Sequence, residues 1–410
     1  MQTQPVHPAT FFALYFPAGI SSGYVTITLP FILARAGFPL GVTGAIVALG
    51  VSGNIWSFVG SPVVDLTLTL KRWYTIGLLA SMVTLVALSL ATLEPSNAAL
   101  IGTWALLSQI GAVFGVLSVP AMIAHHVAPD LKGRAAGWYQ GGNLAGTGIG
   151  GGAGVWLATH TTVAITGLTL ACAMLCGLAA LRFVPDRISD AITTRADTVA
   201  SRWRAVGRDF VDMIRQVDAR FVAVLVMSPI GIGAVSNLWS AVAGDWGASA
   251  NRVALATGVG YGISSMVGCV VGGVVADRLG RWQAFFGAGT VMAAVMVLMY
   301  VAPRSPDMFV FGVIAYGFTQ GLGNAAFSAL ILFTIGRGAA TTKYSILSSL
   351  GNVPFAYMTA IDGRAHDLWG ASGLLLTDAV LGAGFMLPAL AVLWVLSRRR
   401  NSGRSRTLTP

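Results

Sequence analysis

The sequence predicts an all-α membrane protein of twelve transmembrane helices, arranged as two related six-helix bundles. Three observations carry this prediction: the composition, the placement of the charges, and an internal repeat. Of the 410 residues, 55% are hydrophobic and only 10% are charged, whereas a soluble domain has about 25% charged residues. Such a chain cannot cover a water-exposed surface or remain disordered. A soluble enzyme and a disordered protein are therefore both excluded.

Twelve stretches are long enough to span a bilayer, which takes roughly 20 mostly apolar residues each. Eleven contain no Asp, Glu, Lys or Arg, and the twelfth contains one acid, Asp378. The stretches do not alternate in the short segments of a β-barrel. They are residues 11–34, 42–64, 73–93, 98–127, 135–158, 161–181, 221–244, 253–276, 282–303, 308–336, 344–361 and 371–397, numbered below as spans 1 to 12.

The cationic residues predict the orientation. Of the 25 Lys and Arg residues, 21 fall in loops on one side of the predicted membrane, and only Arg35, Arg252, Arg304 and Arg364 fall on the other. The positive-inside rule makes the rich side cytoplasmic. We therefore expect both termini inside, in the inner (cytoplasmic) membrane. The formal charge of +10 is then a topology signal and not a nucleic-acid footprint.

The two halves of the chain resemble each other at offsets of 209 to 212 residues. The matched pairs are Pro17 with Pro229, Asp65 with Asp277, Gln109 with Gln320, and Asn143 with Asn352. We predict a first bundle over residues 1–184, an amphipathic cytoplasmic linker over 185–220, a second bundle over 221–397 and a basic tail over 398–410. Two facing repeats place a substrate site near the bilayer midplane and imply alternating access.

Ionisable groups inside spans are expensive and are functional candidates. Asp378 is the first candidate for binding and releasing a proton during transport, although hydration or pairing with Arg364 is the alternative. Arg35 closes span 1 and is a candidate anchor for an anionic substrate. Its alternative role is that of an interfacial residue whose charged end snorkels to the membrane surface. Arg35 could also approach Asp245 across the outer mouth of the cavity. Asp362 and Gly363 are expected to end span 11, and Asp362 either pairs in the loop that follows or belongs to an outer gate or substrate entrance.

The stretch Gly273-Val274-Val275-Ala276-Asp277-Arg278-Leu279-Gly280-Arg281 resembles the cytoplasmic loop motif of the major facilitator superfamily. The resemblance implies that Asp277, Arg278 and Arg281 act in gating, and that the glycines let spans 8 and 11 approach closely. The first half keeps Asp65, a further gate residue, but has a degenerate copy of the motif.

Two local stretches resemble the peptide, acetyl-coenzyme A and drug transporter subgroup, which includes muropeptide permeases. They are Trp56 to Trp73 and Ala340 to Leu350. The resemblance implies proton-coupled import of a bulky polar solute such as a muropeptide. Alternatives are a siderophore importer, a proton-driven drug or metabolite exporter, and a membrane sensor that does not transport. The glycines of span 5 resemble an antiporter motif without its proline, and close packing against span 8 is their simpler explanation.

Spans 1, 4, 7 and 10 line the cavity in this superfamily, and polar or aromatic residues on them are the expected substrate contacts. They are Tyr24, Gln109, Asn237, Trp239, Tyr316, Gln320 and Asn324, in addition to Arg35. Gln320 and Asn324 share one helix face because they are four residues apart, so they either bind substrate or tie two helices together. No nucleophile–base constellation or metal-ligand spacing is present in the sequence. We expect no enzyme activity, no metal and no cofactor, with a small-molecule substrate, protons and the lipid bilayer as partners of a monomer.

Overall fold

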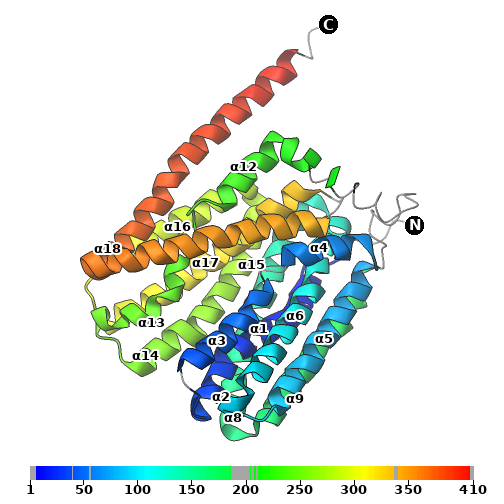
Figure 1. Cartoon of the computed structure of the whole chain (residues 1–410). Helices are drawn as coiled ribbons and strands as arrows, with labels where there is room; N and C mark the ends of the chain where they lie inside the picture. Colours follow the sequence, from blue (N-terminus) through cyan, green and yellow to red (C-terminus); the bar gives the residue numbers. More distant parts are fainter. Residues whose placement is uncertain are drawn as a thin grey trace.

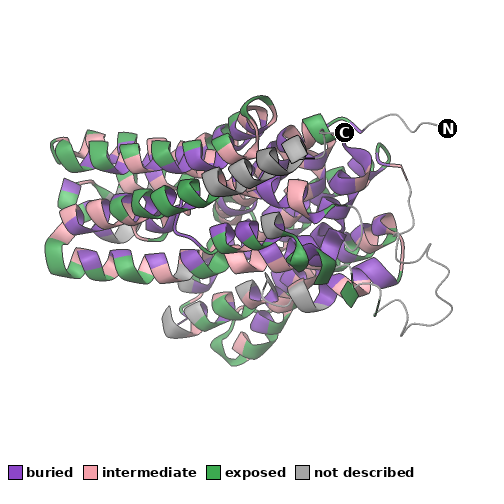
Figure 2. Ribbon diagram, turned by 90° about the horizontal axis from the view of Figure 1, so that it is seen from above, coloured by how far each residue is buried: buried purple, intermediate pink, exposed green. Residues whose placement is uncertain are grey.

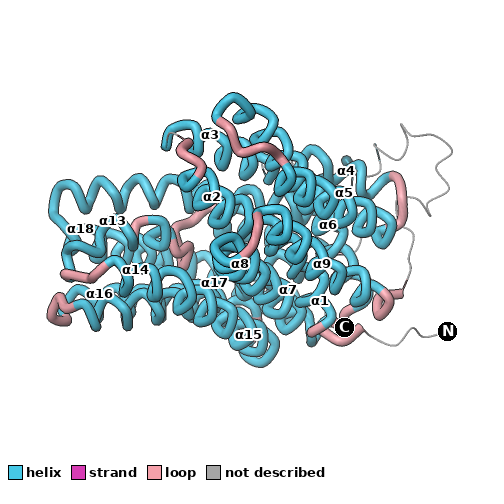
Figure 3. The backbone as a smooth tube through the Cα atoms, turned by 90° about the horizontal axis from the view of Figure 1, so that it is seen from below, coloured by secondary structure: helices cyan, strands magenta, loops and turns pink. Residues whose placement is uncertain are grey.

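The computed structural model describes residues 6–38, 40–54, 57–185, 204, 207–208, 211–336 and 340–406. Helices make up nearly all of this part of the chain, and it contains no strand (Figure 1; Figure 3). The all-helical prediction is confirmed. Trp56 and most of the predicted linker lie outside the described residues.

The described residues of the first half form a series of helical runs, several of them interrupted by a change of helix type. The elements are α1 (Thr10–Gly23), η1 (Tyr24–Thr28), α2 (Leu29–Arg35), α3 (Leu40–Val51), η2 (Ser52–Asn54), α4 (Ser57–Leu66), α5 (Leu70–Leu90), η3 (Pro95–Asn97), α6 (Ala98–His126), η4 (Pro129–Leu131), α7 (Lys132–Gly148), η5 (Ile149–Ala153), α8 (Gly154–His160) and α9 (Val163–Leu181). Local capping sets some of the starts. The Thr69 and Thr162 side chains accept from the backbone N–H groups of Arg72 and Ile165 at 3.3 and 3.2 Å, as N-cap residues do.

The second half is less regular at its start and ends in one very long helix. Its elements are α12 (Val217–Val226), η6 (Ala234–Asn237), α13 (Trp239–Val242), η7 (Ala243–Trp246), α14 (Ala250–Ala254), η8 (Leu255–Gly260), α15 (Tyr261–Leu279), α16 (Arg281–Val301), α17 (Pro306–Ile335) and α18 (Ala340–Arg406). Gly370 has a non-helical backbone (φ 63°, ψ −161°) and divides α18 into two arms. Figure 1 shows these arms diverging from an apex at the left of the molecule.

Eight helices of the described residues are long and apolar enough to cross a membrane. One of them runs from Ala340 to Leu393 and contains both spans 11 and 12 on either side of Gly370. The expected spans 2, 5 and 7 are not among the eight. Span 7 is broken after Val226, and span 5 contains the change of helix type at η5. The count of twelve therefore stays a prediction.

Glycines bring several pairs of helices into backbone contact. A Cβ on Gly137 of α7 would lie 2.4 Å from the Cys269 carbonyl oxygen of α15. A Cβ on Gly273 of α15 would lie 2.6 Å from the Gly133 carbonyl oxygen of α7. The packing of span 5 against span 8 is thus as expected. Span 5 also packs on span 1, since a Cβ on Gly146 would lie 2.1 Å from the carbonyl oxygen of Phe16.

The expectation that the span 8 glycines approach span 11 is wrong. A Cβ on Gly268 or Gly272 would collide with the backbone of α17, at Phe318 and Leu322. Span 8 therefore lies between spans 5 and 10, and α18 lies elsewhere. Small residues permit this close spacing because no bulky side chain stands between the two backbones.

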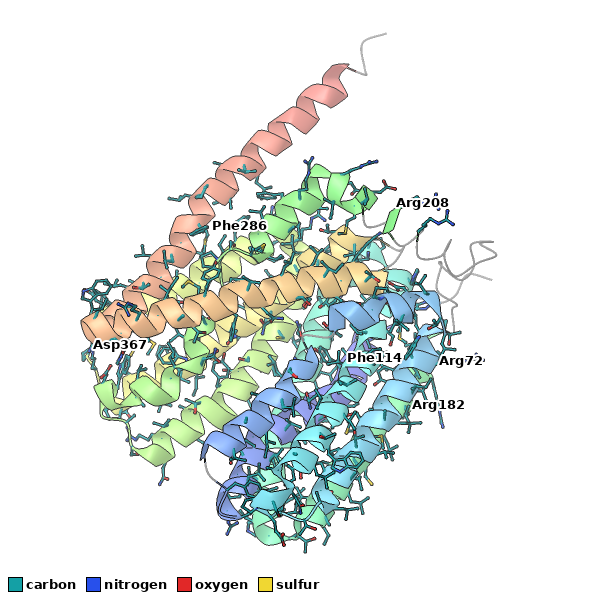
Figure 4. The ribbon with its side chains drawn as sticks, in the orientation of Figure 1. Arg72, Phe114, Arg182, Arg208, Phe286 and Asp367 are labelled. Atoms are coloured by element: carbon teal, nitrogen blue, oxygen red, sulfur yellow. The ribbon has the colours of Figure 1, made fainter. Side chains whose placement is uncertain are left out.

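The labelled cations gather at one end of the molecule. Figure 4 shows Arg72, Arg182 and Arg208 at the end opposite to Asp367. We call the end with the cations the basic end. Exposed residues follow the outward faces of the helices (Figure 2), and many of them are large and apolar, such as Val83 of α5 and Leu168 of α9. Apolar outward faces are what a lipid environment requires.

Candidate functional site

A cavity of about 230 Å³ lies where α17, the first arm of α18 and the broken span 7 meet. One lining residue, Gln140 of α7, comes from the first half of the sequence, and all the others come from the second. The lining consists of Gln140, Leu225, Val226, Ile230, Gly231, Ile232, Phe285, Gln320, Gly323, Asn324, Phe327, Ser348, Gly351, Asn352 and Phe355.

The break in span 7 forms one wall of this cavity. α12 ends at Val226, and helical turns resume only at Ala234. Gly231 and Gly233 have φ values of 64° and 78°, which only glycine adopts readily. Ile230, Gly231 and Ile232 line the cavity. Non-helical backbone at membrane depth is stable only when it is buried in protein or lines a water-filled space.

The helix facing the break is fitted closely to it. A Cβ on Gly323 of α17 would lie 2.9 Å from the Gly231 carbonyl oxygen, and a Cβ on Gly233 would lie 2.5 Å from the Gln320 side chain. The break and Gln320 therefore hold each other in place.

The polar part of the lining consists of uncharged side chains. Gln320 and Asn324 of α17 both line the cavity, as do Ser348 and Asn352 of α18. The Gln320 Oε1 atom is buried and accepts no hydrogen bond from the described residues. Buried amide oxygens normally have a partner, so this atom is free to accept a hydrogen bond from a solute. No charged residue is part of the lining.

Two predicted substrate contacts lie elsewhere, in the packing of the first half. The Gln109 Nε2 atom donates to the Ser21 Oγ at 2.9 Å, and Ser21 and Ser108 share a hydrogen bond of 2.9 Å. All three residues are buried, so Gln109 ties α6 to α1. Tyr24 is fully buried in η1, and its hydroxyl has no partner among the described residues.

Three more predicted substrate contacts lie at or near the C-terminal part of span 7, and none of them lines the cavity. The rings of Trp239 and Tyr316 are 5.3 Å apart in a buried cluster that includes Trp246 and Phe309. The Tyr316 hydroxyl accepts from the Val235 backbone N–H at 3.3 Å. Asn237 is exposed and donates to the Thr359 Oγ1 at 3.1 Å.

Arg35 and Asp245 do not pair with each other. Arg35 is exposed, and its guanidinium lies 5.4 Å from the ring centroid of Phe31. Asp245 instead pairs with His366 of α18, at 2.8 Å between Oδ2 and Nε2.

The two predicted gate acids each bind the N-terminus of a helix from the opposite half of the sequence. Asp277 of α15 accepts from the backbone N–H groups of Gly133 and Arg134 at 2.6 and 2.9 Å, in the first turn of α7. Asp65 of α4 accepts from both the backbone N–H and the Oγ1 of Thr342 at 2.8 and 2.7 Å, near the start of α18. We call these contacts the Asp277 latch and the Asp65 latch.

Helix N-termini suit this arrangement because their first N–H groups lack intrahelical partners and carry partial positive charge. The Asp277 latch also contains Arg134, whose Nε lies 3.4 Å from the carboxylate. The other two predicted gate residues lie just outside it. Arg278 is exposed, and the Arg281 guanidinium lies 5.1 Å from the ring centroid of Trp282.

A polar seam that the sequence did not reveal joins the two halves beside the cavity. The rings of Tyr15 and Tyr139 are 4.2 Å apart, and Tyr139 meets Tyr344 edge-on at 6.2 Å. The Ser328 Oγ accepts from the Gln140 Nε2 at 2.8 Å and from the Tyr344 hydroxyl at 3.3 Å. The repeat offset could have drawn attention to spans 5 and 11, because it pairs Asn143 with the cavity residue Asn352.

The prediction that Asp362 and Gly363 end span 11 is wrong. α18 continues past them to Gly370, which buries Asp362 within the helix instead of leaving it in a loop. The suggested partner of Asp378, Arg364, is exposed, whereas Asp378 is half-buried.

This arrangement of helices is the major facilitator fold. The chain is similar to the crystal structure of the human organic anion transporter MFSD10 (TETRAN), with a TM-score of 0.68, 15% identity, and coverage of 93% of this chain and 98% of that chain. It is also similar to the major facilitator proton:xylose symporter XylE bound to 6-bromo-6-deoxy-D-glucose, with a TM-score of 0.64, 13% identity, and coverage of 92% and 95%. No protein-family model and no curated protein sequence matches the chain. At these identities the likeness establishes the fold, and the muropeptide-permease subgroup stays a prediction.

Proposed function

We propose that this protein is a secondary active transporter that works by alternating access and carries an uncharged polar solute bound in the cavity beside the broken span 7. The observation that carries the proposal is the lining itself. Amide and hydroxyl side chains from three helices converge with non-helical backbone, and no charge is present. Few, well-placed polar groups in a largely apolar pocket are typical of small-molecule sites.

The two latches support a transport cycle. Each ties one half of the sequence to the other through hydrogen bonds. With the basic end cytoplasmic, as the positive-inside rule predicts, the latched conformation is closed toward the cytoplasm. Breaking both latches opens that side. We accordingly assign Asp65 and Asp277 to gating in a monomer of the cytoplasmic membrane.

The cavity also narrows the substrate class. Its volume of about 230 Å³ is below the several hundred Å³ of pockets for drug-sized ligands. A single sugar ring or a short peptide portion fits this volume, whereas a whole muropeptide requires a wider conformation. The uncharged lining favours a hydroxyl- or amide-bearing solute over an organic anion. Xylose, which the similar protein's description as a proton:xylose symporter names, belongs to the favoured class.

We take the proton as the coupling ion. Asp378 lies half-buried in the second arm of α18, and an acid within an apolar span is a natural proton carrier. Import is the direction we propose. The rival exporter differs only in the direction of coupling, and a sensor differs in having no transport at all.

A ligand screen on the purified full-length protein tests the proposal. Thermal stabilisation is measured with neutral sugars, short peptides, muropeptides, siderophores and amphiphilic drugs. Gln320→Ala and Asn324→Ala each remove hydrogen bonds worth about 1 kcal/mol, so the Kd of a true ligand rises about fivefold. Gln283→Ala, at an exposed glutamine of α16, is the matched control and leaves the Kd unchanged.

Counterflow in proteoliposomes then separates the rivals. Uptake of the ligand against its gradient, driven by inward protons, is the expected result. Efflux driven by the same gradient makes the protein an exporter, and binding without counterflow makes it a sensor. Unchanged Kd values in both α17 variants would contradict the proposed site.

A further inference from the structure

Asp362 is a buried acid without a counter-ion. Its side chain is fully buried in the first arm of α18, and neither carboxylate oxygen has a hydrogen-bond partner among the described residues. An isolated ionised carboxylate in such surroundings is very costly and becomes neutral or binds a cation instead. The group therefore needs a ligand that the surrounding side chains do not supply.

A second carboxylate reaches the same place because of the apex at Gly370. Asp362 lies eight residues before Gly370 and Asp378 eight residues after it. At roughly 1.5 Å per residue, each acid is about 12 Å along its own arm from the apex. The arms touch near that apex, since a Cβ on Gly373 would lie 2.4 Å from the Ala365 carbonyl oxygen. The two acids therefore lie at the same level, one on each arm of α18.

The third member of the group is the Tyr316 hydroxyl of α17. It is fully buried in the apolar cluster that also contains Leu375 and Ala379, three residues before and one residue after Asp378. Because it accepts the Val235 backbone N–H at 3.3 Å, its own hydrogen is left to donate elsewhere. Tyr316 was expected to bind substrate, yet it does not line the cavity. Its position instead suits a donor to a carboxylate.

The cations nearby are engaged elsewhere or face solvent. Arg304 donates to the Ser372 Oγ and lies 5.9 Å from the ring centroid of Trp246. His366 pairs with Asp245, and Arg364 is exposed. The titratable and charged groups of the surrounding elements are Tyr261, Tyr316, Asp245, Arg304, Arg364, His366 and Asp367.

We propose that Asp362 and Asp378 form a binding site for a single proton, which the two carboxylates share beneath the apex of α18 and which Tyr316 steadies by donating to the ionised member. The protonated pair carries one negative charge instead of two, so the repulsion between the carboxylates is removed. The proton passes from one carboxyl oxygen to the other, or to water, without any change of covalent bond. Only the role of this site, which is to couple proton entry to transport, rests on the proposed function.

Labelling with dicyclohexylcarbodiimide tests the site without a transport substrate, because the reagent reacts with protonated carboxyl groups in apolar surroundings. The purified full-length protein is labelled at neutral pH, and the modified peptides are identified by mass spectrometry. The expected result is a single initial adduct per chain, at either Asp362 or Asp378. Asp367, exposed on the same helix, is the internal control and remains unlabelled.

Variants show whether the two acids act together. Asp362→Asn and Asp378→Asn are each expected to lose the adduct at the replaced residue and to change the pH dependence of labelling at the other. Asp367→Asn leaves both unchanged. Tyr316→Phe, which removes only the hydroxyl, shifts the distribution of the adduct between the two acids. Size-exclusion profiles and unfolding temperatures identify any variant that fails to fold.

Three outcomes would overturn the proposal. Absence of any adduct at the pair would mean that both acids are ionised and hydrated. Rapid double labelling of one chain would mean two independent neutral acids. Protection by sodium chloride but not by choline chloride would assign the site to a sodium ion. None of these results depends on transport, so a failed substrate screen and a failed proton site are distinguishable.

Discussion

Asp65 and Asp277 bind helix N-termini in equivalent ways, but water reaches their surroundings differently. The Asp65 side chain is 2% exposed, and it accepts from the backbone N–H and the hydroxyl of Thr342. The Asp277 carboxylate is 3% exposed, but the adjacent Arg134 side chain is 42% exposed. A broken Asp277 latch can therefore be hydrated at once, whereas a broken Asp65 latch leaves unpaired groups in a dry place. We therefore expect the burial of the surroundings, and not the number of hydrogen bonds, to make the Asp65 latch the stronger one.

The largest expected effect is that of Asp65→Asn. Hydrogen bonds to a charged acceptor contribute roughly 1.5–3 kcal/mol each, and the amide replaces one acceptor by a donor that faces another donor. We expect the latched conformation to lose about 2 kcal/mol, a roughly 30-fold shift in population. Spin labels at the exposed positions Arg72 and Arg278, in a cysteine-free background, measure the opening at the basic end. Asp277→Asn is expected to open the basic end less than Asp65→Asn does. Equal opening in the two variants would refute the role given to burial.

Gly133→Ala is expected to come next. The new Cβ would lie 2.5 Å from the Asp277 Oδ1 and 2.8 Å from the Gly273 carbonyl oxygen, so α7 and α15 must separate. Overpacking of this kind costs about 1–3 kcal/mol. Gly148→Ala in the same helix has nothing within 4 Å of its Cβ and is the matched control. The same spin-label distances report the result, and equal behaviour of the two variants would argue against close packing at the latch.

Thr342→Val removes one of the two donors to Asp65 and keeps the shape of the side chain. The loss of a single hydrogen bond to the carboxylate is expected to cost about 1.5 kcal/mol and to open the basic end roughly tenfold. Thr334→Val, whose hydroxyl donates within α17 to the Leu330 carbonyl oxygen, is the control. An effect as large as that of Asp65→Asn would mean that the hydroxyl, and not the helix N-terminus, holds the acid.

Arg134→Gln is expected to have the smallest effect. The guanidinium is partly exposed and 3.4 Å from the carboxylate, and exposed ion pairs contribute about 0–1 kcal/mol. The backbone N–H of residue 134 is retained in the variant. Raising the salt concentration should have a similar small effect on the wild type and none on the variant. A salt-insensitive wild type would exclude any contribution from this ion pair.

The sequence predicted those features that depend on a single strong pattern. Charge-free stretches predicted the helices, and the 212-residue offset from Asp65 to Asp277 predicted a pair of equivalent acids. It could not predict how far a helix continues through a polar cluster. Asp362-Gly363 is a common helix end, yet α18 continues to Gly370 and buries Asp362 within the helix. Tertiary packing overrides local propensity in such cases.

The candidate site was predicted only in part for the same reason. Gln320 and Asn324 share a face by spacing alone, and the structure places both on the cavity. Gln109 has the same residue type at the repeat-related place but bonds to Ser21 instead. Which of two equivalent amides meets a cavity depends on the break in span 7. Two glycines with positive φ create that break, and the apolar stretch around them gave no sign of it.

The gate should tolerate most substitutions in the two helix N-termini that donate hydrogen bonds to Asp65 and Asp277. Asp65 and Asp277 accept hydrogen bonds from the main-chain N–H groups of Thr342, Gly133 and Arg134. These N–H groups are present whatever side chain the residue carries. Proline at 134 or 342 would delete the donor itself. Substitutions that damage the gate should therefore concentrate on the two acids, on Gly133, on the hydroxyl of Thr342 and on new prolines, while most other substitutions in the same helix turns have little effect.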